Sequence, residues 1–306
     1  MKKIWITASK GMVGNALIRR LEQDSSYKII STCKNDLDQT NQSAVDDWIK
    51  HYSPDQIIIC SALVGGIHYN DSTSADILYT NSQITLNIIN SAFRYGCNNL
   101  IFLGASCMYP KDADQPLKEQ SLMEGKIEET NLGYGLSKIL GSKLVDLYNK
   151  QHHTCYKCII PAASYGPNDC FDDKKNHVIP ALMNKIHIAK IEKKSCIDIW
   201  GSGNALREFI HVDDMADGII YIMENYKGKS LINLGSGEEV SIKKLAQTLC
   251  KIINYKGDIN YDTSRPEGVK RKILDSSKLQ KIGWSPKIPL EQGLKEMYEN
   301  YKDAFK

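Results

Sequence analysis

The feature that most constrains the fold is an alternation of short apolar runs with amphipathic segments through the first half of the chain. The apolar runs predict strands, and they occupy residues 3–7, 27–32, 56–61, 100–105 and 156–160. The segments between them carry apolar residues at helical spacing and predict helices at 11–22, 44–51, 79–95 and 134–151. Apolar strands separated by helices form parallel sheets that are covered on both faces. The sequence therefore predicts an α/β fold built on a doubly wound parallel sheet.

The first predicted strand runs into a glycine loop in which Gly11 and Gly14 stand at the start of a helix. Glycine there lets the backbone approach a pyrophosphate, and the free amides of the helix terminus bind the anion. The pattern is typical of a Rossmann dinucleotide site, although Ala8 replaces its usual additional glycine. We expect the cofactor to contact Lys10, Gly11, Met12, Val13 and Gly14. A tight strand-to-helix turn without a ligand is the alternative on these residues alone.

The residues after the second predicted strand bear on which dinucleotide is bound. NAD-binding folds usually place an acidic residue there, about 20 residues beyond the glycines, to hold the ribose hydroxyls. This chain has Ser31-Thr32-Cys33-Lys34-Asn35 instead. Lys34, together with Lys10, would neutralise a 2′-phosphate, which favours NADP(H) over NAD. The alternative is that both lysines are merely exposed surface residues.

The pattern loosens after Pro161. Two short strands are predicted at residues 196–200 and 231–234, with helices at 178–188, 213–224, 242–254 and 290–305. We expect residues 1–161 to form the NADP(H)-binding Rossmann domain, with parts of 205–235 returning to it. Residues 162–306 should mainly form a smaller α/β lobe that binds the substrate.

Composition argues against several function classes. Hydrophobic residues make up 42% and charged residues 25% of the 306, as in soluble globular proteins. The net charge of +3 gives no reason to expect a nucleic-acid partner, and no apolar run approaches the roughly 20 residues that span a bilayer. We read no signal peptide at the N-terminus.

The nine cysteines, an odd number without a framework, indicate free thiols in a reducing compartment, and we expect a cytoplasmic protein. Cys155 and Cys158 follow two histidines, but no second Cys/His pair at ligand spacing follows them. Buried strand cysteines are therefore favoured over half a zinc site, and we expect no bound metal.

Tyr134 and Lys138 stand four residues apart in a predicted helix, so their side chains share one face. A neighbouring ammonium favours the phenolate and would lower the phenol pKa from its ordinary value of about 10. The pair is thus a candidate proton donor and acceptor at a carbonyl or carbinol carbon. Alone, the motif is weak, because most such pairs lie on solvated helix surfaces.

Five further sequence segments support the interpretation of Tyr134 and Lys138 as a catalytic pair. They lie at residues 63–67, 103–111, 176–182, 200–214 (200–203 with 207–214) and 271–275, and the most specific reads Leu103-Gly104-Ala105-Ser106-Cys107-Met108-Tyr109-Pro110-Lys111. With them the chain resembles, nearly from end to end, the extended short-chain dehydrogenase/reductase family. Within that family it closely resembles the GDP-L-fucose synthases, which act on a GDP-linked 4-keto-6-deoxy sugar.

The resemblance implies a role for each matching residue. Tyr134 and Lys138 match the catalytic pair, and Cys107 and His177 match the acid/base pair that epimerises the sugar. Lys138, Pro161 and His177 would also contact NADP(H). The nucleotide sugar would be held by Lys185, Trp200, Arg207, Arg265 and Arg271. The family also implies a homodimer formed through the long helices.

Epimerisation and reduction of a 4-keto sugar require an acid, a base and a proton donor of this kind. Protons at C3 and C5 of a 4-keto sugar are acidified by the carbonyl, and inverting these carbons needs a base on one face and an acid on the other. The ordinary pKa values of cysteine, about 8.5, and histidine, about 6.5, suit this exchange. Hydride delivery to C4, with Tyr134 protonating the oxygen, would complete the reaction.

The chain departs from the family at several positions in the expected sugar pocket. Ala105 replaces the usual catalytic serine, and losing one donor to developing negative charge lowers a rate by on the order of a hundredfold or more. Ser106 is the candidate replacement, although on a strand its side chain would point away. Leu63 replaces a usual lysine, and residues 161–164 replace a more polar run.

These departures keep two other functions open. One is a related GDP-sugar enzyme that performs a single half-reaction, such as a C4 reductase of a GDP-6-deoxy-4-keto-heptose. The other is a catalytically weak family member that binds a nucleotide sugar or NADP(H). We expect epimerisation to be retained, because Cys107 and His177 are both present, and reduction to be the step more affected.

Overall fold

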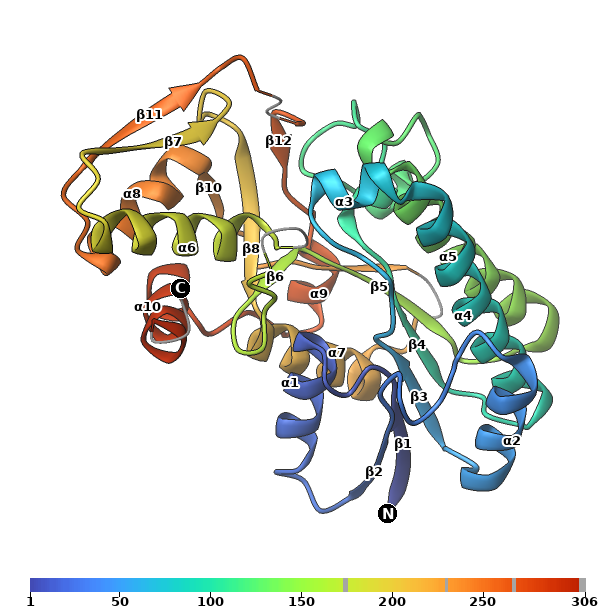
Figure 1. Cartoon of the computed structure of the whole chain (residues 1–306). Coiled ribbons are helices and arrows are strands. Elements are labelled where there is room, and N and C mark those ends of the chain that lie inside the picture. The colour runs from blue at the N-terminus through green and yellow to red at the C-terminus, as the bar shows by residue number, and fades with distance from the viewer. Residues whose placement is uncertain (173–175, 229–230, 266–267, 303–306) are drawn as a thin grey trace.

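A parallel sheet of six strands forms the centre of the molecule (Figure 1). The computed structural model describes residues 1–172, 176–228, 231–265 and 268–302. The strand order is β2-β1-β3-β4-β5-β9. Their bounds are β1 Lys2–Ile6, β2 Tyr27–Ser31, β3 Gln56–Ile59, β4 Leu100–Leu103, β5 Lys157–Pro161 and β9 Ile232–Leu234. Every pairing in this sheet is parallel, as a doubly wound fold requires.

Helices cover both faces of this sheet (Figure 1). One face carries α1 (Met12–Leu21) and α7 (Val212–Asn225), which pack against each other. The other carries α2 (Gln42–Tyr52), α4 (Ser74–Arg94) and α5 (Leu132–His152), with the long α4 and α5 side by side. The expected doubly wound α/β architecture is thereby confirmed.

A second group of elements lies beside the carboxyl edge of the central sheet (Figure 1). In it β8 (Leu206–His211) pairs with β6 (Ala163–Tyr165), β10 (Glu239–Ser241) and β12 (Arg271–Lys272). A separate parallel pair joins β7 (Cys196–Trp200) to β11 (Asp258–Asp262). The helices of this group are α6 Val178–Ile191, α8 Ile242–Ile253 and α10 Leu290–Tyr301.

Short elements complete the chain. Two short helices are α3 (Ile67–Ser72) and α9 (Ser277–Lys281), and three 3-10 turns are η1 (Ser106–Met108), η2 (Glu119–Ser121) and η3 (Glu129–Asn131). The turn η1 directly follows β4, and η3 directly precedes α5. They bring the Cys107 segment and the start of α5 to the same edge of the sheet.

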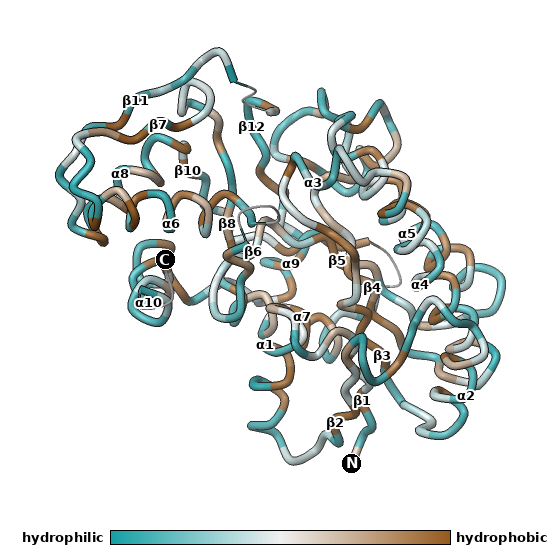
Figure 2. The backbone as a smooth tube through the Cα atoms, in the orientation of Figure 1, coloured by the Kyte–Doolittle hydropathy of each residue, from teal (hydrophilic) through white to brown (hydrophobic). Residues whose placement is uncertain are grey.

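Two separate hydrophobic cores hold these elements. The larger surrounds the central strands and includes the fully buried Trp5, Phe102 and Tyr156. The smaller packs α6, α8 and α10 together and includes Met183 and Leu249. Figure 2 shows hydrophobic colour along the central strands and hydrophilic colour over the outward surfaces of the helices. Each group of elements therefore buries its own apolar surface.

Several predicted elements needed correction. The helix expected at 79–95 starts earlier, at Ser74. The fourth strand ends at Leu103, and Met108 N–H bonds to the Ala105 carbonyl (3.0 Å) to close a 3-10 turn, so Ser106 does not lie on a strand. The predicted 231–234 strand needed no such change: it is β9, at the edge of the central sheet and paired with β5, in line with the expected return of parts of 205–235 to the Rossmann domain. The last predicted helix was placed at 290–305; α10 ends at Tyr301, and residues 303–306 lie outside the described part.

Candidate active site

The glycine loop after β1 leaves room for a dinucleotide pyrophosphate. Gly11 is the N-cap residue of α1, and since it has no side chain, none caps the free amides of the first turn. Its N–H donates to the Ala8 carbonyl (2.9 Å). A Cβ on Gly14 would lie 2.3 Å from that same carbonyl oxygen, so only glycine allows the loop and α1 to approach this closely. The first-turn amides of α1 are consequently available to an anion. These residues fit the dinucleotide, and Ala8 holds the turn with a positive φ of 52°.

The carboxylates that follow β2 accept hydrogen bonds from residues of their own turns. The carboxylate of Asp36 accepts a hydrogen bond from Cys33 N–H (2.7 Å), and that of Asp38 accepts one from Thr40 (3.0 Å). The bond from Cys33 lowers the pKa of Asp36, and the nearby Lys10 ammonium lowers it further. Lys10 and Lys34 are exposed at the edge of the sheet. The two ammonium groups that would contact a 2′-phosphate are thus present at this edge, each beside an aspartate whose pKa it helps to lower.

Tyr134 and Lys138 lie at the start of α5, beside the end of β4. Lys138 is 4% exposed, and its ammonium donates to the Leu103 carbonyl (2.7 Å) and lies 5.6 Å from the centre of the Tyr134 ring. Close packing of the helix depends on Gly141, because a Cβ there would lie 2.3 Å from the Phe102 ring. The two side chains therefore share one face and meet, as their spacing predicted.

Burial controls the pKa of both groups. It lowers the pKa of Lys138 to about 8 and raises that of Tyr134 above its ordinary value, with the nearby Cys107 adding to the rise. We had expected the ammonium to lower the phenol pKa, and this expectation was wrong for the structure as it stands. Desolvation of the phenolate outweighs any attraction of the lysine here. Tyr134 is thus protonated at neutral pH and is suited to donate a proton.

Cys107 lies in η1, at the same edge of the sheet. Burial raises the pKa of its thiol to about 11, and the ammonium groups of Lys272 and Lys138 oppose the rise. A small cavity is lined by Ser106, Cys107, Glu128, Arg271 and Lys272, among other residues. Cys107 therefore stands between the Tyr134/Lys138 pair and the basic strand β12.

His177 occupies the N-cap position of α6, but its side chain makes no capping hydrogen bond. The residue is exposed, yet the surrounding protein displaces enough water to lower the imidazole pKa. The backbone of the preceding residue, Asn176, approaches Gly66 so closely that a Cβ on Gly66 would lie 2.6 Å from the Asn176 carbonyl oxygen. The simple role of a helix cap does not account for the His177 side chain.

The structure shows where Ser106 lies relative to Ala105, which replaces the family's usual catalytic serine. Ala105 has an extended backbone at the end of β4 and offers no hydroxyl. Ser106 is the first residue of η1 and lines the same cavity as Cys107. The 3-10 turn therefore places Ser106 at the same cavity as Cys107.

The predicted substrate residues form two groups. Arg207 and Arg271 lie on the neighbouring strands β8 and β12, and Arg271 is held by a bidentate ion pair with Glu239 (2.7 and 3.1 Å). The guanidinium of Arg265 lies 5.4 Å from the ring centre of Trp200, which is 56% exposed. Lys185 donates to the carbonyl of Asp198 (2.9 Å), on the strand β7 that ends at Trp200. Pro161 ends β5 at the carboxyl edge of the sheet.

The described residues contain neither a candidate metal-binding cluster nor a helix that could span a membrane. No group of three or more histidine, cysteine, aspartate or glutamate side chains in them is arranged to hold a metal ion. None of the helices that the structure describes is both long enough and apolar enough to cross a membrane.

Comparison with known proteins decides the family. Residues 4–235 match the NAD dependent epimerase/dehydratase family. The chain belongs to this family. A GDP-L-fucose synthase from Sinorhizobium fredii is 42% identical over 300 residues, which cover 98% of this chain and 95% of that protein.

Solved structures of epimerase/dehydratase relatives agree with this assignment. A GDP-6-OMe-4-keto-L-xylo-heptose reductase from C. jejuni superposes with a TM-score of 0.93 at 32% identity, covering 99% of this chain and 98% of that one. A GDP-mannoheptose C4 reductase from Campylobacter jejuni with NADP bound gives a TM-score of 0.89 at 34% identity, covering 98% of both chains. The match therefore extends through both groups of elements.

Sequence reasoning missed two charged residues of this epimerase-family site. Lys272 and Glu128 line the cavity beside Cys107 and have opposite effects on the pKa of its thiol. Lys272 directly follows Arg271, so the block at 271–275 was a usable signal. Glu128 had no such signal, because only the fold brings residues before α5 next to β12.

Proposed function

We propose that the protein is an NADP(H)-dependent epimerase/reductase that converts GDP-4-keto-6-deoxy-D-mannose to GDP-L-fucose. The observation that carries the proposal is the meeting of three groups at one sheet edge. The η1 turn packs against the start of α5, since a Cβ on Gly135, the residue after Tyr134, would lie 3.1 Å from the Cys107 carbonyl oxygen, and Cys107 raises the pKa of Tyr134 and opposes the fall in that of Lys138. The 42% identity to a GDP-L-fucose synthase over nearly the whole chain supports the same substrate class.

Epimerisation would come first, with Cys107 and His177 as the acid/base pair. The 4-keto group acidifies the protons at C3 and C5, and one residue removes each proton while the other returns one to the opposite face. The exposed imidazole of His177 has a lowered pKa and is neutral at pH 7, so it can accept a proton. The thiol of Cys107 is protonated and can supply one.

Reduction at C4 would follow in the same pocket. NADPH supplies the hydride for this step when bound. Tyr134, protonated at neutral pH, gives its proton to O4, and the Lys138 ammonium, fixed on the Leu103 carbonyl, stabilises the negative charge left on the phenol oxygen. Gly11, Gly14, Lys10 and Lys34 would hold the dinucleotide.

Two variants separate the half-reactions. In deuterated water without NADPH, the wild-type protein should place deuterium at C3 and C5 of the keto sugar. Cys107→Ser should reduce this exchange strongly, whereas Tyr134→Phe should leave it and abolish NADPH oxidation. Retention of full exchange in Cys107→Ser would contradict the epimerase assignment.

A second function is favoured by one observation. The similarity to GDP-heptose reductases, with a TM-score of 0.93 for one of them, and the loss of the serine at Ala105 fit an enzyme with a different keto sugar or a single half-reaction. A GDP-6-deoxy-4-keto-heptose reduced without deuterium uptake at C3 and C5 would establish this alternative.

We also propose a homodimer formed through α4 and α5. These adjacent helices expose apolar side chains that a monomer would leave in water, namely Tyr79 (68% exposed), Leu86 (40%), Leu136 (40%) and Leu147 (58%). The nine free thiols are consistent with a cytoplasmic, reducing location. Light scattering of the wild type and of Leu147→Glu tests the dimer, which the charge should weaken.

A further inference from the structure

The loop that follows β6 is anchored at Asn168. This residue has a positive φ of 65°, which asparagine tolerates better than most residues. Its side-chain amide donates to Oδ1 of Asn15 on α1 (2.8 Å), and its backbone N–H donates to the hydroxyl of Tyr301 on α10. One residue thus ties the loop to two helices that are distant in the sequence.

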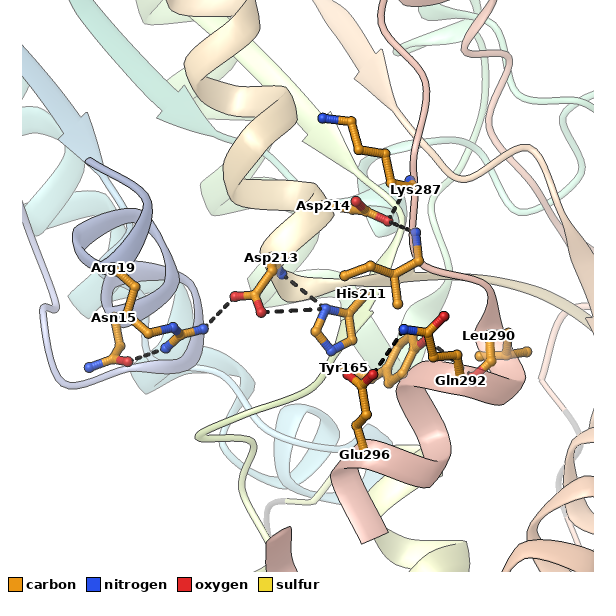
Figure 3. A network of polar contacts seen from close by, with 11 residues as sticks. Asn15, Arg19, Tyr165, His211, Asp213, Asp214, Lys287, Leu290, Gln292 and Glu296 are labelled. Carbon is orange, nitrogen blue, oxygen red and sulfur yellow. Dashed lines mark hydrogen bonds and ion pairs between the residues drawn. The ribbon is translucent and has the colours of Figure 1, made fainter. Parts of the chain in front are cut away.

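The anchor point on α1 is itself fixed. Asn15 directly follows Gly14, so it lies in the first turns of the helix whose amides face the dinucleotide. Arg19 donates to the same Oδ1 and forms an ion pair with Asp213 at the start of α7, which lies beside His211 (Figure 3). Asn15 therefore presents its oxygen to Asn168 in a defined orientation.

The rest of the loop packs against the C-terminal helix. The rings of Phe171 and Tyr301 lie 4.7 Å apart. Asp169 is 9% exposed, and its Oδ1 accepts a hydrogen bond from Cys170 N–H (2.8 Å). The thiol-bearing residue Cys170 is nevertheless exposed to solvent. The loop is thus ordered from within, with one reactive group on its surface.

We propose that Asn168 is a positioning residue that couples the dinucleotide-binding helix to the loop leading to His177. Through Asn15, anything that fixes the first turns of α1 also fixes residues 166–172, and the Asp172 carbonyl of this loop accepts a hydrogen bond from the N–H of Asn176 (2.8 Å), the residue before His177. Binding of NADP(H) would then restrict the loop, and the loop would hold the acid/base residue in place. The role given to His177 rests on the proposed function, whereas the anchor does not.

Cys170 provides a reporter of this anchor. The alkylation rate of Cys170 is measured residue by residue with iodoacetamide and mass spectrometry, with and without saturating NADP⁺, whose binding is followed independently. Cys196, exposed on β7 in the other part of the molecule, is the control thiol in the same sample. The variants are Asn168→Gly, which keeps the positive φ and removes the amide, and Asn15→Ala, which removes its partner.

Both variants should raise the alkylation rate of Cys170 several-fold without cofactor and leave that of Cys196 unchanged. NADP⁺ should slow Cys170 alkylation several-fold in the wild type and much less in either variant. In the keto-sugar exchange assay, Asn168→Gly should lower the rate at saturating substrate more than it raises KM.

An unchanged Cys170 rate in both variants would overturn the anchor, and equal protection by NADP⁺ in all three proteins would overturn the coupling. If the protection pattern holds but no GDP-sugar is turned over, the proposed function fails and the coupling stands. A protein that unfolds would be recognised because the buried thiols of Cys33, Cys97 and Cys158 would then react as well.

Discussion

Replacing Gly66 by alanine tests whether the loop after β3 places His177. A Cβ at this position would lie 2.6 Å from the carbonyl oxygen of Asn176, the residue before His177. Ordinary contact starts at 3.4 Å, so the two backbones must separate by roughly 0.8 Å. The φ of Gly66 is −67°, which alanine adopts freely, so the contact is the main perturbation.

A displacement of this size next to an acid/base residue should slow the reaction strongly. Misplacement of a reacting group by about 1 Å lowers rates by on the order of a hundredfold, so we expect deuterium exchange at C3 and C5 to fall roughly ten- to a hundredfold. NADPH binding should change less than exchange, because the glycine loop after β1 is untouched and only the His177 contact with the cofactor is displaced. Mass spectrometry of the keto sugar after timed incubation in deuterated water measures the effect.

Gly65→Ala is the matched control. Its Cβ would meet the Tyr69 ring at 2.8 Å, and a side chain can rotate away where the Asn176 backbone cannot. If Gly66→Ala exchanges deuterium as fast as the wild type, or if both variants lose exchange equally, the reasoning about Asn176 is refuted.

Three further substitutions test other parts of the account. Ala8→Gly should relieve the positive φ of 52° and raise stability by at most about 1 kcal/mol without weakening NADPH binding; a lower melting temperature would contradict this. Ala105→Ser should raise the rate of NADPH oxidation by on the order of tenfold or more and leave deuterium exchange unchanged, since it restores a donor to O4. Asp169→Asn should raise the melting temperature at about pH 8 and not at about pH 4, because burial raises the pKa of Asp169 from 3.8 to about 7. Between these two pH values the folded state binds more protons than the unfolded state. The free energy of unfolding of the wild type therefore falls as pH rises through this window, by at most about 4 kcal/mol. A stability difference between Asp169→Asn and the wild type that does not depend on pH would refute the raised pKa of Asp169.

The parts of the fold that follow from local pattern were predictable from the sequence. The first strand β1, the glycine loop and α1 follow from apolar runs, glycine spacing and helical periodicity. The face shared by Tyr134 and Lys138 follows from a spacing of four residues. These features depend on residues that are close together in the chain.

The rest depends on contacts between distant segments. The strands β6, β10 and β12 have only two or three residues each, too few to show an apolar alternation. The rise of the Tyr134 pKa comes from burial by the surrounding fold, which no spacing reveals. The anchor at Asn168 joins residues separated by 153 and 133 positions.

The most direct test of the central claim is identification of the product. GDP-4-keto-6-deoxy-D-mannose is incubated with the protein and NADPH in deuterated water, and the stereochemistry and deuterium content of the sugar are determined by NMR. The account predicts GDP-L-fucose with deuterium at C3 and C5. A C4-reduced sugar that retains the D-manno configuration and carries no deuterium at these carbons would contradict it.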